Sequence, residues 1–353
     1  MIRMKKSLVV LSTAAITLMA VSCSKSSGDS DETTGNWVSR SAFDGKPRGF
    51  AATFNIGDVV YVGTGFNYAE LNGAIAYRDF WRYQPNIGQW ELMAAVPGYG
   101  RSGAVGFSAS GKGYIGLGND SLSHAMNDFY QYDPTGNTWT AIAPFPATDG
   151  RYQAVAFGIK DTGYVGTGSN PGGSYRDFYK YDANANSWTQ IESCPGDKRS
   201  GSSAFISADT AGYVVAGANT GSNALNTDFA YYKPADGHWH SLRPIFNKSS
   251  DSYDDDYSDI KRTQAAIFVI GSNAYLSTGA QTPGGTPFTK TWLYDIKNDQ
   301  WTRRTPFEKQ ARTGAIGFSF SGRGFIGLGS ASSSQQLDDI VEFQPNVTED
   351  TND

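Results

Sequence analysis

Residues 101–118, RSGAVGFSASGKGYIGLG, decide the fold of this chain. They contain two short apolar segments separated by a Ser-Gly-Lys turn, and the second segment ends in Gly-x-Gly. The sequences NDFYQYDP at 127–134 and NTWT at 137–140 follow, and both are typical of short strands bounded by turn residues. The stretch therefore opens a unit of four short β-strands.

This unit recurs six times along the chain. Each copy restarts at an arginine, and successive restarts are 48 to 63 residues apart. In five copies an aromatic residue in the third strand precedes a tryptophan in the fourth strand by seven positions. A period near 50 residues built from four strands is the sequence signature of a β-propeller blade. The restart arginines are Arg48, Arg101, Arg151, Arg199, Arg262 and Arg312.

The missing tryptophan of the sixth copy is found at the other end of the chain. That copy ends near Phe343, whereas Trp37 precedes Arg48 by 11 residues, the offset that also separates Trp90 from Arg101. We therefore expect residues 36–43 to form the outermost strand of the last blade, which pairs the two ends and removes an open sheet edge. The sequence predicts an all-β, six-bladed propeller over 36–345, with four antiparallel strands per blade and a disordered tail at 346–353.

These repeats resemble those of the kelch-repeat family. The resemblance covers residues 36–345 and rests on paired glycines after an apolar strand, as in YVGTG at 61–65, followed by a tyrosine and then a tryptophan. The adjacent Gly-Gly of the family is here Gly-x-Gly, and the fourth and fifth copies keep only Gly217 and Gly279. Kelch propellers include actin binders, degradation adaptors, galactose oxidase and the sialic acid mutarotase, so the resemblance implies the fold and leaves the activity open.

The amino-terminal segment is typical of a lipoprotein signal peptide. Residues 1–22 combine a short basic start with an apolar stretch, and the sequence AVSC at 20–23 makes Cys23 the expected lipidated residue. An ordinary secretory signal with an incidental cysteine is the alternative. Residues 23–35 are polar and are expected to form a disordered tether. These features predict a lipid-anchored protein of the outer membrane or cell surface, with a periplasmic orientation also compatible.

Charge and cysteine content restrict the partners. The formal net charge is −5, and removal of Arg3, Lys5 and Lys6 with the signal makes it −8. This balance disfavours nucleic acid and leaves the lipid anchor as the only expected membrane contact. Cys194 is the only cysteine in the repeat region, so we expect no disulfide framework and a buried, unreactive thiol.

The chain direction places the variable segments on one face of the predicted propeller. In a four-stranded antiparallel blade, the start of the first strand and the loop between the second and third strands lie at the same end. We call this end the loop face. It carries the restart arginines and the loops 66–78, 119–127, 169–176, 218–227, 280–290 and 330–338.

The six arginines admit two interpretations. Around an axial mouth they would form a positive funnel that binds a carboxylate or another anion. Alternatively, each arginine pairs with an acid of its own or the adjacent blade, and recurrence in all blades favours this structural role. One set of acids precedes the arginines and the other opens the third strands: Asp44, Asp149, Asp197, Asp259 and Glu308, and Asp79, Asp128, Asp177, Asp228 and Asp339.

Blades four and five break the repeat. The exit of blade four is longer and acidic, NKSSDSYDDDYSD at 247–259, and blade five has Lys290 where other blades have aspartate. A solvated loop is favoured over a calcium site at 251–259, because no DxDxDG turn is present. These two blades are the first candidates for a specific contact surface.

Enzymatic interpretations are limited by residue supply. Only three histidines are present, which disfavours a copper oxidase, a zinc site or a histidine triad, and predicts no metal or other cofactor. A sialic acid mutarotase needs only a cation for the carboxylate and a general acid or base. The candidates for these roles are Glu70, Glu308 and Arg312.

A binding module without chemistry is the favoured interpretation. The expected partner is a glycan, an acidic small molecule or an envelope protein, bound by a monomeric propeller through the six arginines and the loop aromatics. The N-acetylneuraminate mutarotase is the alternative. The aromatics on the variable segments are Phe66, Tyr68, Tyr77, Tyr99, Tyr175, Tyr253, Tyr257 and Phe288.

Overall fold

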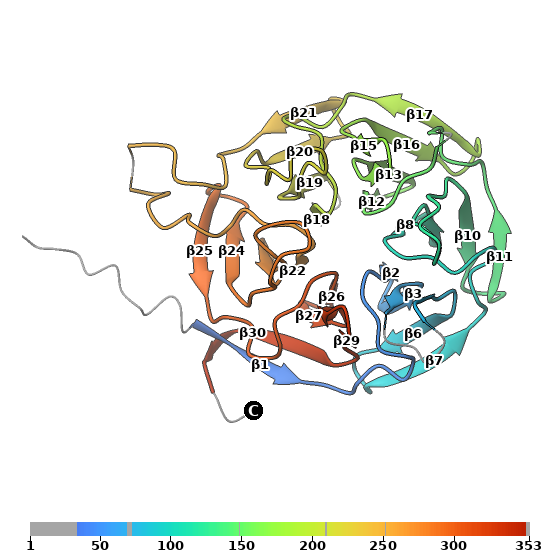
Figure 1. Cartoon of the computed structure of the whole chain (residues 1–353), viewed down its shortest axis with the longest axis horizontal. Helices are drawn as coiled ribbons and strands as arrows, with labels where there is room; N and C mark the ends of the chain where they lie inside the picture. Colours follow the sequence, from blue (N-terminus) through green and yellow to red (C-terminus); the bar gives the residue numbers. More distant parts are fainter. Residues whose placement is uncertain (1–33, 69–72, 148, 209, 251, 351–353) are drawn as a thin grey trace, which may run out of the picture.

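Six four-stranded antiparallel sheets surround a central axis in the computed structural model of this chain (Figure 1). The structure describes residues 34–350 except 69–72, 148, 209 and 251. The predicted signal peptide, Cys23 and nearly all of the tether lie outside these residues. The described part is all β-structure, and no helix in it is long and apolar enough to cross a membrane.

Each blade is a four-stranded meander whose first strand lies nearest the axis (Figure 1). Blade one is β2 (Ala52–Ile56), β3 (Val59–Gly63), β6 (Phe80–Gln84) and β7 (Gln89–Met93). Blade two is β8 (Val105–Ala109), β9 (Lys112–Gly116), β10 (Phe129–Asp133) and β11 (Thr138–Ala141). Blade three is β12 (Val155–Ile159), β13 (Thr162–Gly166), β16 (Phe178–Asp182) and β17 (Ser187–Ile191).

The second half of the ring follows the same plan. Blade four is β18 (Ser203–Ser207), β19 (Ala211–Val215), β20 (Ala230–Lys233) and β21 (His238–Ser241). Blade five is β22 (Ala266–Ile270), β23 (Asn273–Ser277), β24 (Thr291–Asp295) and β25 (Gln300–Arg304). Blade six is β26 (Ile316–Phe320), β27 (Arg323–Gly327), β30 (Ile340–Thr348) and β1 (Thr34–Ser39).

Three short ribbons lie in the loops between second and third strands. They are β4 (Phe66–Asn67) with β5 (Ile75–Ala76), β14 (Ser169–Asn170) with β15 (Gly173–Ser174), and β28 (Ser330–Ser332) with β29 (Gln335–Gln336).

The ring closes as predicted, through a strand from each end of the chain. Strand β1 pairs antiparallel with β30, and Trp37 stands opposite Phe343 (Figure 1). Trp37 is fully buried, and its indole Nε1 donates a hydrogen bond to the Thr305 carbonyl of blade five at 3.2 Å. The strand covers 34–39 rather than the predicted 36–43, because the chain then leaves the sheet and buries Phe43 against blade one.

The seven-residue spacing between the third-strand aromatic and the fourth-strand tryptophan has a simple structural basis. In every blade the third-strand aromatic stands directly opposite the fourth-strand tryptophan, so their rings meet across the sheet: Tyr83/Trp90, Tyr132/Trp139, Tyr181/Trp188, Tyr232/Trp239, Tyr294/Trp301 and Phe343/Trp37. Such cross-strand aromatic pairs stabilise antiparallel sheets.

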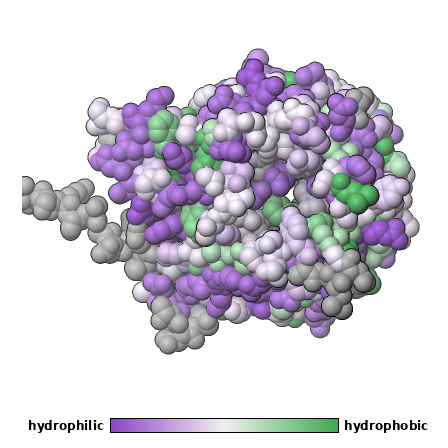
Figure 2. Space-filling view, viewed as in Figure 1, coloured by the Kyte–Doolittle hydropathy of each residue, from purple (hydrophilic) through white to green (hydrophobic). Residues whose placement is uncertain are grey.

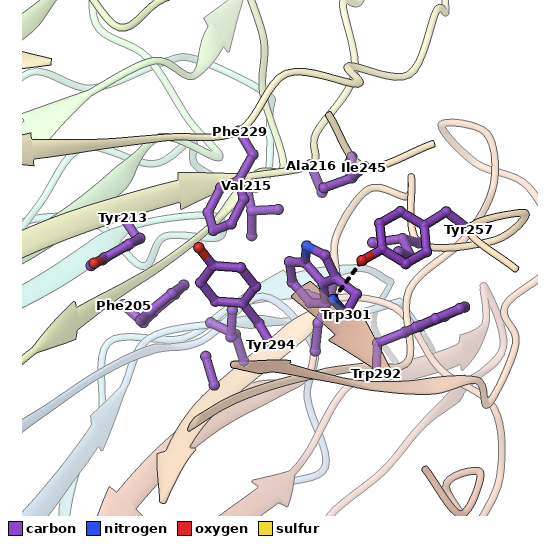
Figure 3. Packing of buried hydrophobic residues seen from close by; sticks show 14 of the residues in the cluster. Phe205, Tyr213, Val215, Ala216, Phe229, Ile245, Tyr257, Trp292, Tyr294 and Trp301 are labelled. Carbon is purple, nitrogen blue, oxygen red and sulfur yellow. Dashed lines mark hydrogen bonds between the residues drawn. The ribbon is translucent and has the colours of Figure 1, made fainter. Parts of the chain in front are cut away.

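Aromatic side chains also fill the space between blades. Figure 3 shows one such cluster between blades four and five. Phe205 and Tyr213 come from the first two strands of blade four, and Phe229 comes from the loop after them. These rings pack against Tyr294 and Trp301 of blade five. The ring centroids of Phe229 and Tyr294 are 4.7 Å apart and nearly perpendicular. The core is therefore continuous from one blade to the next, as expected for a blade that cannot bury both faces alone.

The second glycine of Gly-x-Gly joins neighbouring blades. Gly118 has φ of +93°, and its N–H donates to the carbonyl of Arg151 in the next blade at 2.8 Å. An added Cβ would lie 2.7 Å from the Ser102 carbonyl oxygen, so both conformation and space require glycine. The same bond occurs six times around the ring, which explains why Gly217 and Gly279 persist in blades four and five where the first glycine is lost.

We predict that Trp37→Ala lowers the free energy of unfolding by about 3–5 kcal/mol, because it removes a buried indole from the strand that closes the ring. Leu92→Ala is the control, since Leu92 is 59% exposed and its loss costs less than about 0.5 kcal/mol. Chemical denaturation measures both values. Equal stability of the two variants contradicts the closing role of Trp37.

Candidate functional site

The six restart arginines are buried and form hydrogen bonds within their own blades. Each is at most 1% exposed. In the blade-two example, Nη1 and Nη2 of Arg101 donate to the two carboxylate oxygens of Asp128 at 2.7 and 2.8 Å, and Nη1 also reaches the Leu117 carbonyl. The same aspartate fork recurs in three other blades, as the pairs Arg48/Asp79, Arg151/Asp177 and Arg312/Asp339. In blade four, Nη2 of Arg199 contacts the Asp228 carboxylate, and Nη1 donates to the backbone carbonyls of Ala216 and Asp228.

This geometry favours the structural interpretation of the arginines over the anion funnel. The partner acids are those that open the third strands, and the planar forks that would grip a ligand carboxylate already hold an aspartate. None of the six arginines lines the pocket described below. Their role in ligand binding stays a prediction.

Several loop aromatics that were candidates for ligand stacking instead cover these arginines. The guanidinium carbon of Arg48 lies 4.2 Å from the Tyr77 ring centroid, and Arg151 lies 4.3 Å from Tyr175. Phe288 covers Arg262 in the same way at 4.5 Å. Such contacts stabilise a desolvated cation without a second carboxylate.

Blade five lacks the aspartate and satisfies its arginine differently. Arg262 donates to the backbone carbonyls of Thr278, Lys290 and Asp259 at 2.7 to 2.9 Å. Burial lowers the pKa of Arg262 to about 9, because nearby Asp259 offsets only part of the cost of desolvation. The replacement of aspartate by Lys290 in blade five thus removes a carboxylate from the interior, and the Lys290 backbone carbonyl binds Arg262 in its place.

A closed ring of backbone hydrogen bonds surrounds the axis on the loop face. The residue two positions after each arginine donates its N–H to the carbonyl of the equivalent residue in the preceding blade, at 2.7 to 3.0 Å. All six residues have positive φ values of 51° to 62°. In chain order they are Phe50, Gly103, Gln153, Gly201, Gln264 and Gly314, so large side chains alternate with glycine.

The alternation creates the floor of a pocket. The Phe50 ring lies where a Cβ of Gly314 would be, at 2.7 Å, and the Gln153 and Gln264 side chains similarly lie over Gly103 and Gly201. The Gln264 side-chain amide donates to that of Gln153 at 3.3 Å. The three large side chains therefore occupy the space that the three glycines leave free.

The axial pocket has a volume of about 630 Å³ and opens on the loop face. Figure 2 shows this face, on which pale side chains of intermediate hydropathy predominate around the axis. The walls are the loops of blades one, two, five and six and the segment after Arg151. Its lining residues are Phe50, Phe66, Tyr68, Ala74, Ser102, Asn119, Asp120, Ser121, Ser123, Tyr152, Gln153, Gln264, Gly284, Gly285, Pro287, Thr313, Ser330, Ala331, Ser332 and Ser333.

Asp120 is the only charged residue among these. Its Oδ1 accepts the backbone N–H groups of Leu122 and His124 at 2.8 and 2.9 Å, and its Oδ2 lies 3.0 Å from the imidazole Nδ1 of His124. Burial by itself raises the pKa of Asp120, but the hydrogen bonds from His124 and Leu122 outweigh burial and leave the pKa below its usual value. The pocket wall therefore carries a carboxylate at neutral pH, beside a 73% exposed imidazole.

Two of the three predicted catalytic residues, Glu308 and Arg312, are not among the residues that line this pocket. Glu70 lies outside the described residues. Glu308 is half-buried and does not line the pocket, and Arg312 is fully buried against Asp339. Of the loop aromatics, Phe66 and Tyr68 do line it, with ring centroids 4.3 Å apart.

The acidic segment of blade four folds back on blade five. Tyr257 is 1% exposed, and its hydroxyl accepts the backbone N–H of Trp301 at 2.7 Å (Figure 3). The Asp254 carboxylate accepts the backbone N–H groups of Lys248 and Ser249, and Asp259 accepts the Trp292 indole N–H. Two of the acids considered for calcium thus hold the segment in place. In the described part of the chain, no group of three His, Cys, Asp or Glu residues is placed to hold a metal ion.

Sequence reasoning missed the floor residues. Phe50, Gln153 and Gln264 stand two residues after the restart arginine of their blades. The other three blades have glycine at this position. Comparison of that one column across the six copies could have found them, since it alternates between a large side chain and none. Asp120 and His124 stand in a variable loop, and no spacing rule pointed to them.

We predict that Asp128→Ala destabilises the protein by about 2–4 kcal/mol, because Arg101 stays buried without its carboxylate. Glu91→Ala removes the exposed pair with Arg82 and costs less than about 1 kcal/mol. Denaturant titration at pH 7 compares the two. Hydrogen bonds and charge from Arg101 outweigh burial and lower the pKa of Asp128, so the difference between wild type and variant should shrink as the pH falls through that lowered pKa.

We also predict that the Cys194 thiol is inert in the folded protein. It is fully buried, and burial raises its pKa to about 11, so the thiolate is scarce at pH 8. In a Cys23→Ser chain, a colourimetric disulfide reagent should label no thiol until denaturant is added and one thiol afterwards. Labelling at a rate typical of a free cysteine in native buffer contradicts this.

Comparisons with known proteins agree with the repeat architecture. No family model matches the sequence. A 60-residue stretch is 42% identical to N-acetylneuraminate epimerase of Yersinia enterocolitica, and a 92-residue stretch is 33% identical to the enzyme of the same name from Pasteurella multocida. These stretches span 15% and 25% of this chain, and 15% and 22% of those relatives.

The fold has a close counterpart among solved structures. The structure of YjhT superimposes with a TM-score of 0.69 and 14% identity, over 86% of this chain and 99% of that chain. This likeness concerns the fold. With the six-fold repeat, the Gly-x-Gly strands and the closure of blade six by β1, it shows that the chain has the fold of a six-bladed β-propeller.

Proposed function

We propose that this protein is a sugar mutarotase, an enzyme that speeds the exchange between the two anomers of a free cyclic sugar. The observation that carries the proposal is the identity to two proteins named N-acetylneuraminate epimerase. These names favour the enzymatic alternative over the binding module without chemistry that the sequence alone favoured. We therefore prefer a catalytic function to a purely binding one.

The axial pocket has the dimensions that the proposal requires. Its volume of about 630 Å³ falls within the range of small-molecule sites, about 300–1,000 Å³. It lies over a rigid ring of backbone hydrogen bonds, and its walls are variable loops. Binding sites are commonly built in this way, with loops supplying the chemistry and the scaffold fixing their positions.

Anomer exchange requires two proton transfers. Ring opening moves a proton from the anomeric hydroxyl to the ring oxygen as the bond between that oxygen and the anomeric carbon breaks. Closure on the other face of the carbonyl reverses both transfers, so no proton, electron or group is gained or lost. One acid and base at the sugar, with water as the second, is enough.

The pair formed by Asp120 and His124 supplies the candidate acid and base. Asp120 lines the pocket, whereas His124 is 73% exposed beside it in the same loop and is not itself a lining residue, so the role requires a sugar that extends from the pocket to this imidazole. The Asp120 carboxylate lies 3.0 Å from Nδ1 of His124, which holds a proton on that nitrogen and leaves Nε2 to exchange protons with a sugar. Asp120 itself is fixed by the two backbone N–H groups of its own loop. This arrangement of a carboxylate that orients an imidazole is a recurring form of general acid and base.

A binding role without catalysis is the second candidate. It is favoured by the Phe66 and Tyr68 rings on the pocket wall, because Tyr68 is 49% exposed and offers a face for stacking. Attachment through Cys23 at the outer membrane or cell surface stays a part of the proposal in both cases, and the envelope setting would give either protein access to external glycans.

We predict that the wild-type protein accelerates anomer exchange in at least one free sugar, as followed by proton NMR after dissolving a single crystalline anomer. The panel contains N-acetylneuraminate and neutral hexoses with their N-acetylated forms. His124→Ala should reduce the acceleration about 100-fold, the usual contribution of a general acid and base.

The matched control is His240→Ala. His240 also lies 3.0 Å from an aspartate, Asp236, but on β21 at the outer edge of blade four. This variant should keep full activity. No acceleration by wild type with any sugar contradicts the proposed function, and equal loss in both variants contradicts the role of His124.

A further inference from the structure

We propose that the axial pocket binds a neutral, hydroxyl-rich sugar ring, with Gln153 and Gln264 as the polar floor and Phe50 as the apolar floor. The inference rests on the proposed function for the reaction, but the binding site is argued from the pocket alone. It departs from the sugar acid in the relatives' names.

The charge of the pocket is wrong for a sugar acid. Asp120 is the only charged residue among the described residues that line it, and it is a carboxylate. Residues 69–72, outside the described part, are Ala, Glu, Leu and Asn, so they add no cation. A carboxylate taken into a pocket without a cationic partner loses its hydration and is repelled by Asp120.

The arginines that could have supplied that cation are occupied. All six are at most 1% exposed; four hold an aspartate through their forks, and Arg199 contacts Asp228 through one nitrogen. To free one of them, a ligand would have to break a buried ion pair and leave the aspartate behind. A buried ion pair broken in this way leaves an uncompensated charge in the interior, and that cost opposes the gain from the new pair with the ligand.

The two glutamines offer the groups that hydroxyls need. A single hydrogen bond of 3.3 Å joins the Gln264 amide to the Gln153 amide. Whichever way the amides are oriented, the pair keeps one NH₂ group and one carbonyl oxygen that it does not use on itself. A sugar hydroxyl both donates and accepts, so adjacent hydroxyls can satisfy both groups.

A second glutamine pair on the loop face shows the contrast. Gln310 and Gln335 bond each other reciprocally, with both amide distances at 2.9 Å, and neither lines the pocket. That pair uses an NH₂ and a carbonyl of each side chain on the other. The floor pair is therefore the one with capacity for a ligand, and the second pair is a natural control.

The aromatic residues complete the chemistry of a sugar site. Phe50 forms the floor beside the glutamines, and Phe66 and Tyr68 stand at the wall. The C–H face of a pyranose packs on such rings while its hydroxyls reach polar groups at the edge. Gly103, Gly201 and Gly314 keep this floor flat, because an added Cβ at each would contact the floor side chain above it at 2.7 to 3.2 Å.

Isothermal titration calorimetry tests the inference. The probes are glucose, galactose, mannose, their neutral N-acetylated forms and N-acetylneuraminate. We expect at least one neutral sugar to bind at least about tenfold more tightly than N-acetylneuraminate. The double variant Gln153→Ala/Gln264→Ala should weaken that neutral sugar at least about tenfold, whereas Gln310→Ala/Gln335→Ala should leave it unchanged.

The outcomes separate this inference from the proposed function. Tighter binding of N-acetylneuraminate, binding of no neutral sugar, or unchanged binding in the floor variant overturns the neutral-sugar site. Binding of a neutral sugar without anomer exchange upholds the site and rejects the mutarotase. Acceleration of N-acetylneuraminate with no neutral sugar bound upholds the mutarotase and rejects this inference.

Asp120→Asn provides an independent readout. It keeps an acceptor for the loop N–H groups and removes the charge. If repulsion by Asp120 excludes the acid, N-acetylneuraminate should bind several-fold more tightly to this variant, while the neutral sugar changes less. An equal effect on both sugars contradicts the electrostatic argument.

Discussion

The buried arginine fork is the interaction on which the rest of the structure depends. In four blades a guanidinium that is at most 1% exposed spans from the start of the first strand to an aspartate carboxylate at the start of the third, and it also binds the carbonyl inside Gly-x-Gly; in blade four Arg199 makes a single contact with the equivalent Asp228. One side chain thus ties together three segments of its blade. The backbone carbonyl of the same arginine accepts the N–H of the second glycine of Gly-x-Gly in the preceding blade. The arginine therefore links segments within its own blade and also links neighbouring blades.

Much of the fold could be predicted from the sequence because its signals are repeated. The seven-residue spacing from Tyr132 to Trp139 is the separation of two residues that face each other across a tight hairpin, and its five copies left little freedom in the choice of fold. The closure by Trp37 followed from one missing copy. The exact end of β1 did not, because the burial of Phe43 against blade one is a tertiary contact that no local pattern announces.

The site was less accessible to sequence reasoning for the opposite reason. Repetition directed attention to the arginines, and residues that recur in every blade serve what every blade needs. Gln153 and Gln264 matter because they depart from glycine, and Asp120 and His124 because they occur once. The acidic segment of blade four stood out as an exception, yet Tyr257 and Asp259 attach it to blade five, and Asp254 holds the segment together from within.

The ring of backbone bonds around the axis has a consequence for selectivity. Each of its six peptide N–H groups donates to the carbonyl of the preceding blade, and the six bonds run in one rotational sense around a closed circle. Their dipole components along the circle cancel, and none of these six donors is left unpaired, unlike the N–H groups at the open end of a helix that attracts phosphate. The six N–H groups of this ring are therefore not available to a ligand in the pocket above it. Any selectivity of the pocket would come from the side chains that line it, which can change without breaking the ring of backbone hydrogen bonds.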